Sequence, residues 1–374
     1  MTGNFRLPPL PLPIEPKVHP HFNLECPAED RFEAVTLEYA DRFKLYHSKE
    51  QRARMRNTEN SRLAAWMYPH GSDELLQIGS DFVLWAFAFD DEYCDEGPLS
   101  NDPVLFIQKA GEILRAIDSP EDPPCNDDKY AMAARDMRQR LDRYAKPVQV
   151  ARFVEAFRWY VTAEILKITN LKPSLSDFLV QRLYSGGGWA FPILVHVVAD
   201  IDITPEEYED RRVRAISEML AMLTVLDPEL YAYPKEIARA VNDKEHNLIQ
   251  IMCRDHQCSL EEGIRHCYDF RWRIISLFLR LRDDVMKDAS PGLRAYIETF
   301  ALYWAGSITW VCGNNRYYSV DGLVQTGLVS GGELTFDCPP ESFESIGVPS
   351  FEWWWEYDPA RRAGFRREKV AAHG

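Results

Sequence analysis

The sequence contains no long apolar run. The longest ones, FVLWAFAF (82–89) and residues 191–198, are far shorter than the ~20 residues that a membrane-spanning helix needs. The N-terminus has no apolar core followed by a small-residue cleavage site, which argues against a secretion signal. We therefore predict a cytoplasmic protein without a membrane span.

Basic residues and paired cysteines are also scarce. The formal net charge is −15, from 43 Lys and Arg against 58 Asp and Glu. This balance argues against nucleic acid as a partner, because phosphate contacts need basic side chains, and against an anionic membrane surface. The eight cysteines form no C-x-x-C pair and no Cys/His set with zinc spacing. We interpret them as free thiols in a reducing compartment.

Strand signals are rare, whereas helical signals recur through most of the chain. Alternating apolar residues and hairpin dipeptides are scarce, and apolar residues at helical spacing are separated by short connections rich in Pro or Asp. Ser259 in SLEE begins a capping box. We predict an all-α fold. The expected helices are approximately 31–46, 75–94, 103–117, 128–144, 148–168, 175–200, 205–226, 229–252, 259–284 and 291–312.

Composition divides the chain into three parts. Residues 1–22 read as a Pro-rich extended leader, and residues 23–325 as one α-helical domain. Residues 326–374 combine a Gly- and Pro-rich linker with the Trp-rich stretch FEWWWEY. That stretch is either a flap or docking segment, or it packs on the helical body.

Clustered acids follow the apolar run directly, in FDDEYCDEG (89–97). Carboxylates that repel one another persist beside apolar surface when a hard cation neutralises them. Oxygen ligands at a helix end favour Mg²⁺, which is usually completed by substrate phosphates. A diphosphate held by metal at the rim of an apolar pocket is one interpretation. The other is a solvated acidic helix end.

A second unusual stretch is FLVQRLYSGGGWAFP (178–192). It places Arg182 in a helical run and Ser185, Gly186 and two further glycines one turn later. Glycines inside an apolar helix cost stability. They are explained where a ligand approaches the backbone or a helix breaks toward a cavity, or by tight helix packing.

Three motifs, FDDEYCDE, QRLYSGG and WVCGNNRYYS, resemble those of class I terpene cyclases of the microbial type. The likeness covers roughly residues 20–325, and the acidic motif looks closest to that of bacterial 2-methylisoborneol synthases. The resemblance implies a single helical bundle with a central active-site cavity, and a homodimer as a possible assembly. It also implies Mg²⁺, up to three ions, with Asp90, Asp91 and Asp95 as ligands.

The same resemblance assigns roles around the glycines. Arg182 matches the arginine that senses the diphosphate. Ser185 matches the linker position, and Gly186 matches the effector position, whose backbone carbonyl helps to trigger ionisation.

The second metal motif of the family departs from its pattern here. It should supply Asn, Ser and Glu at LDPELYAYPKE (226–236), where Pro228, Ala232 and Glu236 stand. Pro and Ala have no side-chain oxygen that could bind a metal. Binding of fewer than three Mg²⁺ ions is therefore an alternative. Pro228 also lacks a backbone N–H, which predicts that a helix starts or kinks there.

Two other sets of residues bear on this second motif. Asp227 and Glu229 are the nearest substitutes for the missing ligands. A rival placement starts at Asn242 in VNDKEHNLIQ, but it offers His and Gln in place of Ser and Glu. We favour the placement that ends at Glu236.

The resemblance further implies that a C-terminal Asn and an Arg-Tyr pair contact the diphosphate. Asn314 matches the first, and Arg316 and Tyr317 lie early but are candidates for the pair. Aromatic faces stabilise carbocations by ~0.5–2 kcal/mol each. The aromatic candidates are Phe82, Phe87, Trp189, Trp304 and Trp310, of which Phe87 is strongest because it lies about one turn before Asp90.

The expected function is a class I terpene cyclase that ionises an allylic prenyl diphosphate and cyclises the carbocation. Farnesyl diphosphate is favoured as substrate, and 2-methylgeranyl diphosphate is the alternative. A degenerate protein that binds an isoprenoid or a partner without turnover is a second alternative, supported by Pro228 and Ala232. A prenyl-elongating synthase is disfavoured, because those enzymes carry two Asp-rich motifs and LRDDV (281–285) lacks the extra acid.

Overall fold

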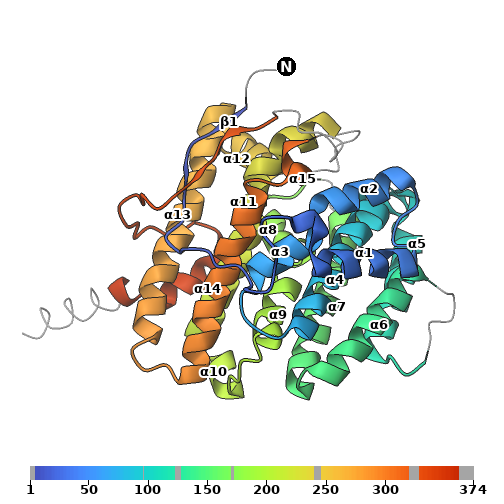
Figure 1. Ribbon diagram of the computed structural model, residues 1–374. Helices are drawn as coiled ribbons and strands as arrows, with labels where there is room; N and C mark the ends of the chain where they lie inside the picture. Colours follow the sequence, from blue (N-terminus) through green and yellow to red (C-terminus); the bar gives the residue numbers. More distant parts are fainter. Residues whose placement is uncertain are drawn as a thin grey trace, which may run out of the picture.

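The computed structural model describes residues 5–95, 97–122, 128–169, 172–239, 246–319 and 328–361. Within them the fold is all-α, as predicted, apart from four two-residue strands (Figure 1). The start of the leader, the junction at 320–327 and residues 362–374 lie outside the described residues. No described helix carries an apolar stretch long enough to cross a bilayer.

Most of the helices form one bundle. They are α1 (Arg31–Phe43), α2 (Lys49–Thr58), α3 (Asn60–Met67), α4 (Asp73–Phe89), α5 (Pro103–Asp118), α6 (Lys129–Tyr144), α7 (Pro147–Thr169), α8 (Leu175–Ser185), α9 (Ala190–Val198), α10 (Pro205–Glu209), α11 (Arg211–Arg239), α12 (Leu248–His256), α13 (Leu260–Val285), α14 (Pro291–Val311) and α15 (Asn315–Tyr318). Short 3₁₀ turns lie at η1 (Pro27–Glu29), η3 (Pro98–Asn101) and η4 (Pro349–Tyr357), and η2 (Asp90–Asp95) is a π-helical turn.

Polar caps set many of the helix starts. Ser259 accepts a hydrogen bond from the Glu262 N–H, and the Glu262 carboxylate accepts one from the Ser259 N–H, which confirms the predicted capping box. Ser174 and Asp177 form a second box at the start of α8. These side chains satisfy backbone N–H groups that have no partner within the helix.

Two predicted boundaries are wrong. The run at 175–200 is split into α8 and α9 at the Gly186–Trp189 turn. No helix starts at Pro228, because α11 runs through it with both Pro228 and Pro234 inside the helix. Leu226, Leu230 and Tyr231 around the proline are buried. Their burial offsets the ~3 kcal/mol that an interior proline costs.

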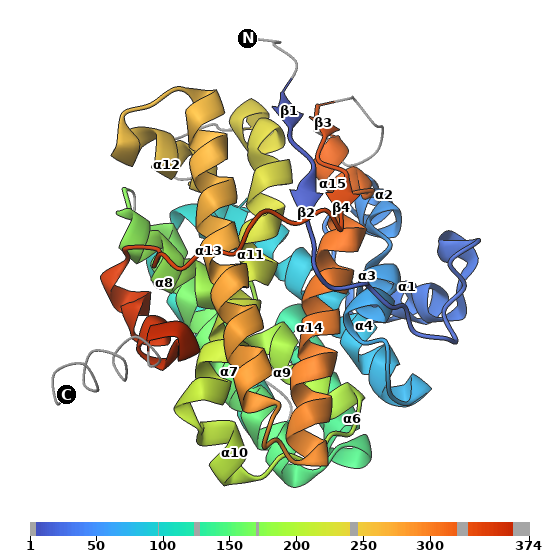
Figure 2. The same ribbon diagram turned by 90° about the vertical axis from the view of Figure 1, so that its left-hand side faces the viewer.

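The leader and the C-terminal segment pair with each other on the surface of the bundle, at residues 6–11 and 330–335, which we call the belt. β1 (Arg6–Leu7) pairs in parallel with β3 (Ser330–Gly331), and β2 (Leu10–Pro11) pairs with β4 (Leu334–Thr335) (Figure 2). The belt is fastened to α13, where the Tyr268 hydroxyl donates to the Pro8 carbonyl at 2.7 Å. The leader is therefore part of the folded body.

The Trp-rich segment follows the belt in the chain and forms η4. η4 places Trp354 and Trp355 in the core, and the indole N–H of Trp354 donates to Glu218 Oε2 on α11 at 3.0 Å. Arg280 on α13 pairs with Asp358 just after η4 at 2.8 Å. The segment thus packs on the helical body.

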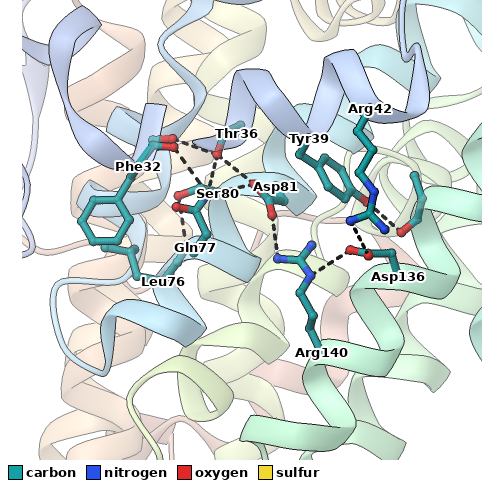
Figure 3. Close-up of polar contacts among 12 residues, drawn as sticks. Phe32, Thr36, Tyr39, Arg42, Leu76, Gln77, Ser80, Asp81, Asp136 and Arg140 are labelled. Atoms are coloured by element: carbon teal, nitrogen blue, oxygen red, sulfur yellow. Dashed lines mark hydrogen bonds and ion pairs between the residues drawn. The ribbon is translucent and has the colours of Figure 1, made fainter. Parts of the chain in front are cut away.

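A buried polar network joins α4 to α1 and α6 (Figure 3). Asp81 is fully buried, and its carboxylate accepts hydrogen bonds from Thr36 and Gln77 and pairs with Arg140 at 2.7 Å. Arg140 also contacts Asp136. Because a buried charge is costly without its partners, this network fixes the position of α4 against its neighbours.

Replacing Arg140 with Met should destabilise the protein by about 3 kcal/mol, because Asp81 is left as an unpaired buried charge. The measurement is chemical denaturation followed by circular dichroism. Arg265→Met is the control, since Arg265 makes a 3.7 Å pair with Glu262 at an exposed site and should change stability by less than about 0.5 kcal/mol. Equal effects of the two substitutions would contradict the role given to the network.

Candidate active site

A cavity of about 770 Å³ lies inside the bundle. Its charged lining comes from α2, the turn after α4, the last turn of α7, α8, the end of α11 and the short helix α15. Its apolar lining comes from earlier turns of the same helices and from α3, α8, α9 and α14. The cavity therefore has a charged rim at one end and an apolar base.

Three carboxylates form what we call the acidic wall: Asp90, Asp91 and Asp95. Their oxygens lie within 4.8 Å of one another. In an α-helix the residue above Asp90 is four positions later, which is Cys94. The π-helical turn shifts that neighbour to the fifth position, so Asp95 joins Asp90 at the rim and Cys94 is buried. The chain thus builds the wall by widening one turn.

Lys167 on α7 lies between two of these carboxylates. Its Nζ is 2.9 Å from Asp90 Oδ1 and 2.7 Å from Asp95 Oδ1. Burial and repulsion from Asp90 raise the pKa of Asp95 to about 7, although Lys167 acts in the opposite direction. Glu164, one turn earlier on α7, is buried, and its burial raises its pKa to about 8.

The third carboxylate of the wall is paired separately. Asp91 accepts two hydrogen bonds from the Arg316 guanidinium on α15, at 3.0 and 3.3 Å. Burial acts to raise the pKa of Asp91, but Arg316 outweighs it and the pKa lies below its usual value. The same guanidinium lies over the Phe87 ring, 4.2 Å from its centroid. Arg316 thus connects the rim with an aromatic face below it.

The facing side of the rim, which we call the α11 wall, consists of Pro228, Glu229, Ala232, Lys235 and Glu236. Arg182 on α8 pairs with Glu229 at 2.8 Å, and Glu229 also accepts a hydrogen bond from the Leu248 N–H. Burial raises the pKa of Glu229 to about 7, although Arg182 lowers it. Glu236 accepts a hydrogen bond from the Asn247 amide at 2.7 Å.

The two walls differ in their fit to a divalent cation. The acidic wall offers three clustered carboxylates, which are the oxygen donors that Mg²⁺ prefers. Pro228 and Ala232 offer no side-chain donor, and Glu229 already holds Arg182. The acidic wall therefore fits a metal ion better than the α11 wall, where the predicted ligand Glu236 is the remaining carboxylate. Asn242, the rival placement of the second motif, lies outside the described residues.

Most of the residues predicted from the sequence meet in this cavity. The lining includes Phe87, Asp90, Asp91, Asp95, Arg182, Ser185, Gly186, Glu236, Trp310, Arg316 and Tyr317. Ser185 is buried, and among the described residues its hydroxyl has no hydrogen-bond partner. A Cβ on Gly186 would lie 3.2 Å from a terminal nitrogen of Arg182, so the glycine leaves room for that guanidinium.

Four predicted residues lie elsewhere. Phe82 packs in the core against Phe153 and Phe191, and Trp189 is buried under Arg214. The Trp304 indole donates to Asp227 Oδ2 at 2.9 Å, away from the lining. Asn314 caps α15 and donates to the Thr58 carbonyl. It therefore positions Arg316, and the three aromatics pack in the core.

The sequence interpretation missed several charged residues of the rim. They are Arg54, Lys167 and Lys235, and the buried Glu164 lies beside Lys167 behind the rim. The available signal was EILK (164–167), an acid and a base about one turn apart near the end of the predicted helix 148–168. Arg54 comes from α2, which was not predicted as a helix, so no periodicity argument pointed to it.

Such a cavity can bind an amphiphile with one anionic end. The rim combines clustered metal-ligand carboxylates with guanidinium groups that suit phosphate oxygens. The base offers aromatic faces from Phe87, Trp310 and Phe191. The chemistry that these surfaces support is charge stabilisation at a leaving group above an aromatic pocket.

Comparisons with known proteins agree with this geometry. A family model described as terpene synthase family 2, C-terminal metal binding, matches residues 81–304. Germacradien-6-ol synthase of Streptomyces pratensis is 30% identical over 354 residues, which cover 94% of this chain and 96% of that protein. (+)-T-muurolol synthase of Roseiflexus castenholzii is 28% identical, covering 80% of this chain and 90% of its own.

A solved structure extends the match to the fold. The crystal structure of a protein from ancestral sequence reconstruction superimposes with a TM-score of 0.76 at 28% identity, covering 94% of this chain and 98% of its own. The family model spans more than half of this chain and includes both the acidic wall and the α11 wall. The chain belongs to the terpene synthase family.

Proposed function

We propose that the protein is a class I terpene cyclase that ionises farnesyl diphosphate with the help of Mg²⁺ and cyclises the resulting carbocation. The observation that carries the proposal is the 770 Å³ cavity with its acidic, Arg-containing rim over an aromatic base. This division matches a substrate with a diphosphate at one end and an apolar chain at the other.

At the rim, the diphosphate would meet both a metal and basic side chains. Mg²⁺ held by Asp90, Asp91 and Asp95 would act as a Lewis acid toward the diphosphate oxygens. Arg182 and Arg316 line the same rim, and they would donate hydrogen bonds to the same group. The C–O bond breaks heterolytically, its electron pair leaves with the diphosphate, and an allylic cation remains in the pocket.

Below the rim, the aromatic base would contain that cation. Phe87 and Trp310 are stacked with their centroids 6.0 Å apart, and both line the cavity. Each aromatic face contributes ~0.5–2 kcal/mol toward a nearby cation. Walls that exclude water would favour ring closure over capture of the cation by solvent.

Farnesyl diphosphate is supported by two of the similar proteins. 4-epi-cubebol synthase of Streptosporangium roseum and the T-muurolol synthase are both named as cyclising (2E,6E)-farnesyl diphosphate. The alternative, 2-methylgeranyl diphosphate, rests on the likeness of the acidic motif and of the Pro-rich leader to those of 2-methylisoborneol synthases. We therefore place farnesyl diphosphate first.

Purified protein with Mg²⁺ should convert farnesyl diphosphate into a cyclic hydrocarbon or alcohol, detected by gas chromatography–mass spectrometry. Geranyl, 2-methylgeranyl and geranylgeranyl diphosphate serve as the comparison panel, and excess chelator should abolish product. A cyclic product from 2-methylgeranyl diphosphate alone would overturn the assignment of farnesyl diphosphate as the substrate. No product from any of them, with the protein folded, would favour the degenerate binder.

The second prediction concerns the acidic wall. Asp90→Asn should lower turnover by at least about a hundredfold, because it removes charge at the site where the leaving group is stabilised. The helical circular-dichroism spectrum should not change. Asp283→Asn is the matched control, since Asp283 is 67% exposed and pairs with its neighbour Arg282 outside the cavity lining. Wild-type activity in Asp90→Asn would remove Asp90 from the site.

A further inference from the structure

The acidic wall already contains a cation, the ammonium group of Lys167. It lies within hydrogen-bond distance of both Asp90 and Asp95, at 2.9 and 2.7 Å. These are two of the three carboxylates that fit a divalent cation. A metal ion bound to the same oxygens would repel the ammonium strongly at this distance. The two cations therefore compete for one position.

A second acceptor for this ammonium lies beside it. Glu164 is one turn before Lys167 on α7, and its Oε2 is 3.8 Å from Lys167 Nζ. Its side chain is 1% exposed, and neither carboxyl oxygen has a hydrogen-bond partner among the described residues. A buried carboxyl group without partners is costly, so this one is poised to accept a donor.

Charge balance points in the same direction. Asp90, Asp95 and Glu164 gather around the single ammonium of Lys167, whereas Asp91 is balanced by Arg316. The carboxyl groups of this cluster therefore outnumber its cationic groups by two. A divalent cation bound there would reduce that imbalance.

We propose that Lys167 is a tethered counter-ion of the acidic wall, which moves to Glu164 when a divalent cation binds. The proposal rests on the proposed function, because it takes the acidic wall to be a metal site. Lys167 holds the carboxylates together before metal binds and sets the metal affinity by competition. Glu164 receives the displaced ammonium. Both are positioning residues, since neither is assigned a contact with the substrate.

The local geometry makes this movement small. Both side chains project from the same helix one turn apart, so α7 need not move. Lysine has a flexible four-carbon stem and three donors, and only the two toward Asp90 and Asp95 are within 3 Å of a carboxylate here. A rotation of the side chain is enough to exchange those partners for Glu164.

The test measures metal binding without substrate. Mn²⁺ is titrated into the metal-free, full-length protein, and free Mn²⁺ is followed by electron paramagnetic resonance. Lys167→Gln should bind Mn²⁺ at least about tenfold more tightly than the wild type, because the competing charge is gone. Lys146→Gln, which removes an exposed lysine paired with Asp200 and Asp202, should match the wild type. Unchanged or weaker binding in Lys167→Gln would overturn the proposal.

Glu164→Gln provides the second arm and carries the test alone if Lys167→Gln does not fold. It should weaken Mn²⁺ binding several-fold, because the ammonium loses its alternative acceptor. In the Lys167→Gln background, Glu164→Gln should weaken Mn²⁺ binding less, because that variant has no ammonium group for Glu164 to accept. Equal weakening in both backgrounds would show instead that Glu164 acts on the metal directly. An unchanged affinity in the single variant would exclude the acceptor role.

These measurements separate the proposal from the proposed function. Mn²⁺ affinity is read without any diphosphate, so a protein that forms no terpene can still support or overturn the role of Lys167. A protein that forms product but whose Lys167→Gln variant binds Mn²⁺ no better retains the proposed function and loses this inference.

Discussion

The compensation of charge around one half-buried rim is the constraint on which the rest of the site depends. The acidic side chains of the cavity lining are Asp90, Asp91, Asp95, Glu229 and Glu236, and the basic ones are Arg54, Lys167, Arg182, Lys235 and Arg316. The rim is balanced although the chain as a whole carries −15. Each pair joins different elements, such as η2 to α7 and α8 to α11. Because such charges are costly when unpaired, the pairs fix the registry of the helices that form the pocket.

The sequence was sufficient for the helical class and for the acidic wall, because both depend on local pattern. Asp90 and Asp95 follow an apolar helix, and a widened turn is enough to bring them together. The aromatic candidates were harder, since periodicity gives the face of a helix but not its neighbour. Phe87 and Phe82 lie on the same helix, yet the first meets Arg316 at the rim and the second meets Phe191 in the core. That difference is set by tertiary packing.

Pro228 also shows that tertiary contacts can override a local sequence signal. Proline is a strong local signal against a helix interior, yet α11 continues through it. Leu230 and Tyr231 next to it are buried, and Tyr231 donates a hydrogen bond to the Gly332 carbonyl of the belt. Contacts with a segment about a hundred residues away thus outweigh the local preference. Such contacts are not visible in the sequence pattern around the proline.

The α11 wall differs from the acidic wall in what it can neutralise. Where the family pattern implies Asn and Ser, this chain has Pro228 and Ala232, while Lys235 and Arg182 line the same side of the rim. A metal ion and a basic side chain both stabilise charge on a departing diphosphate, but a metal ion needs donors and a lysine does not. In the proposed reaction, neutralisation of the diphosphate would therefore be divided between metal on the acidic wall and two basic side chains, Lys235 on the α11 wall and Arg182 on α8.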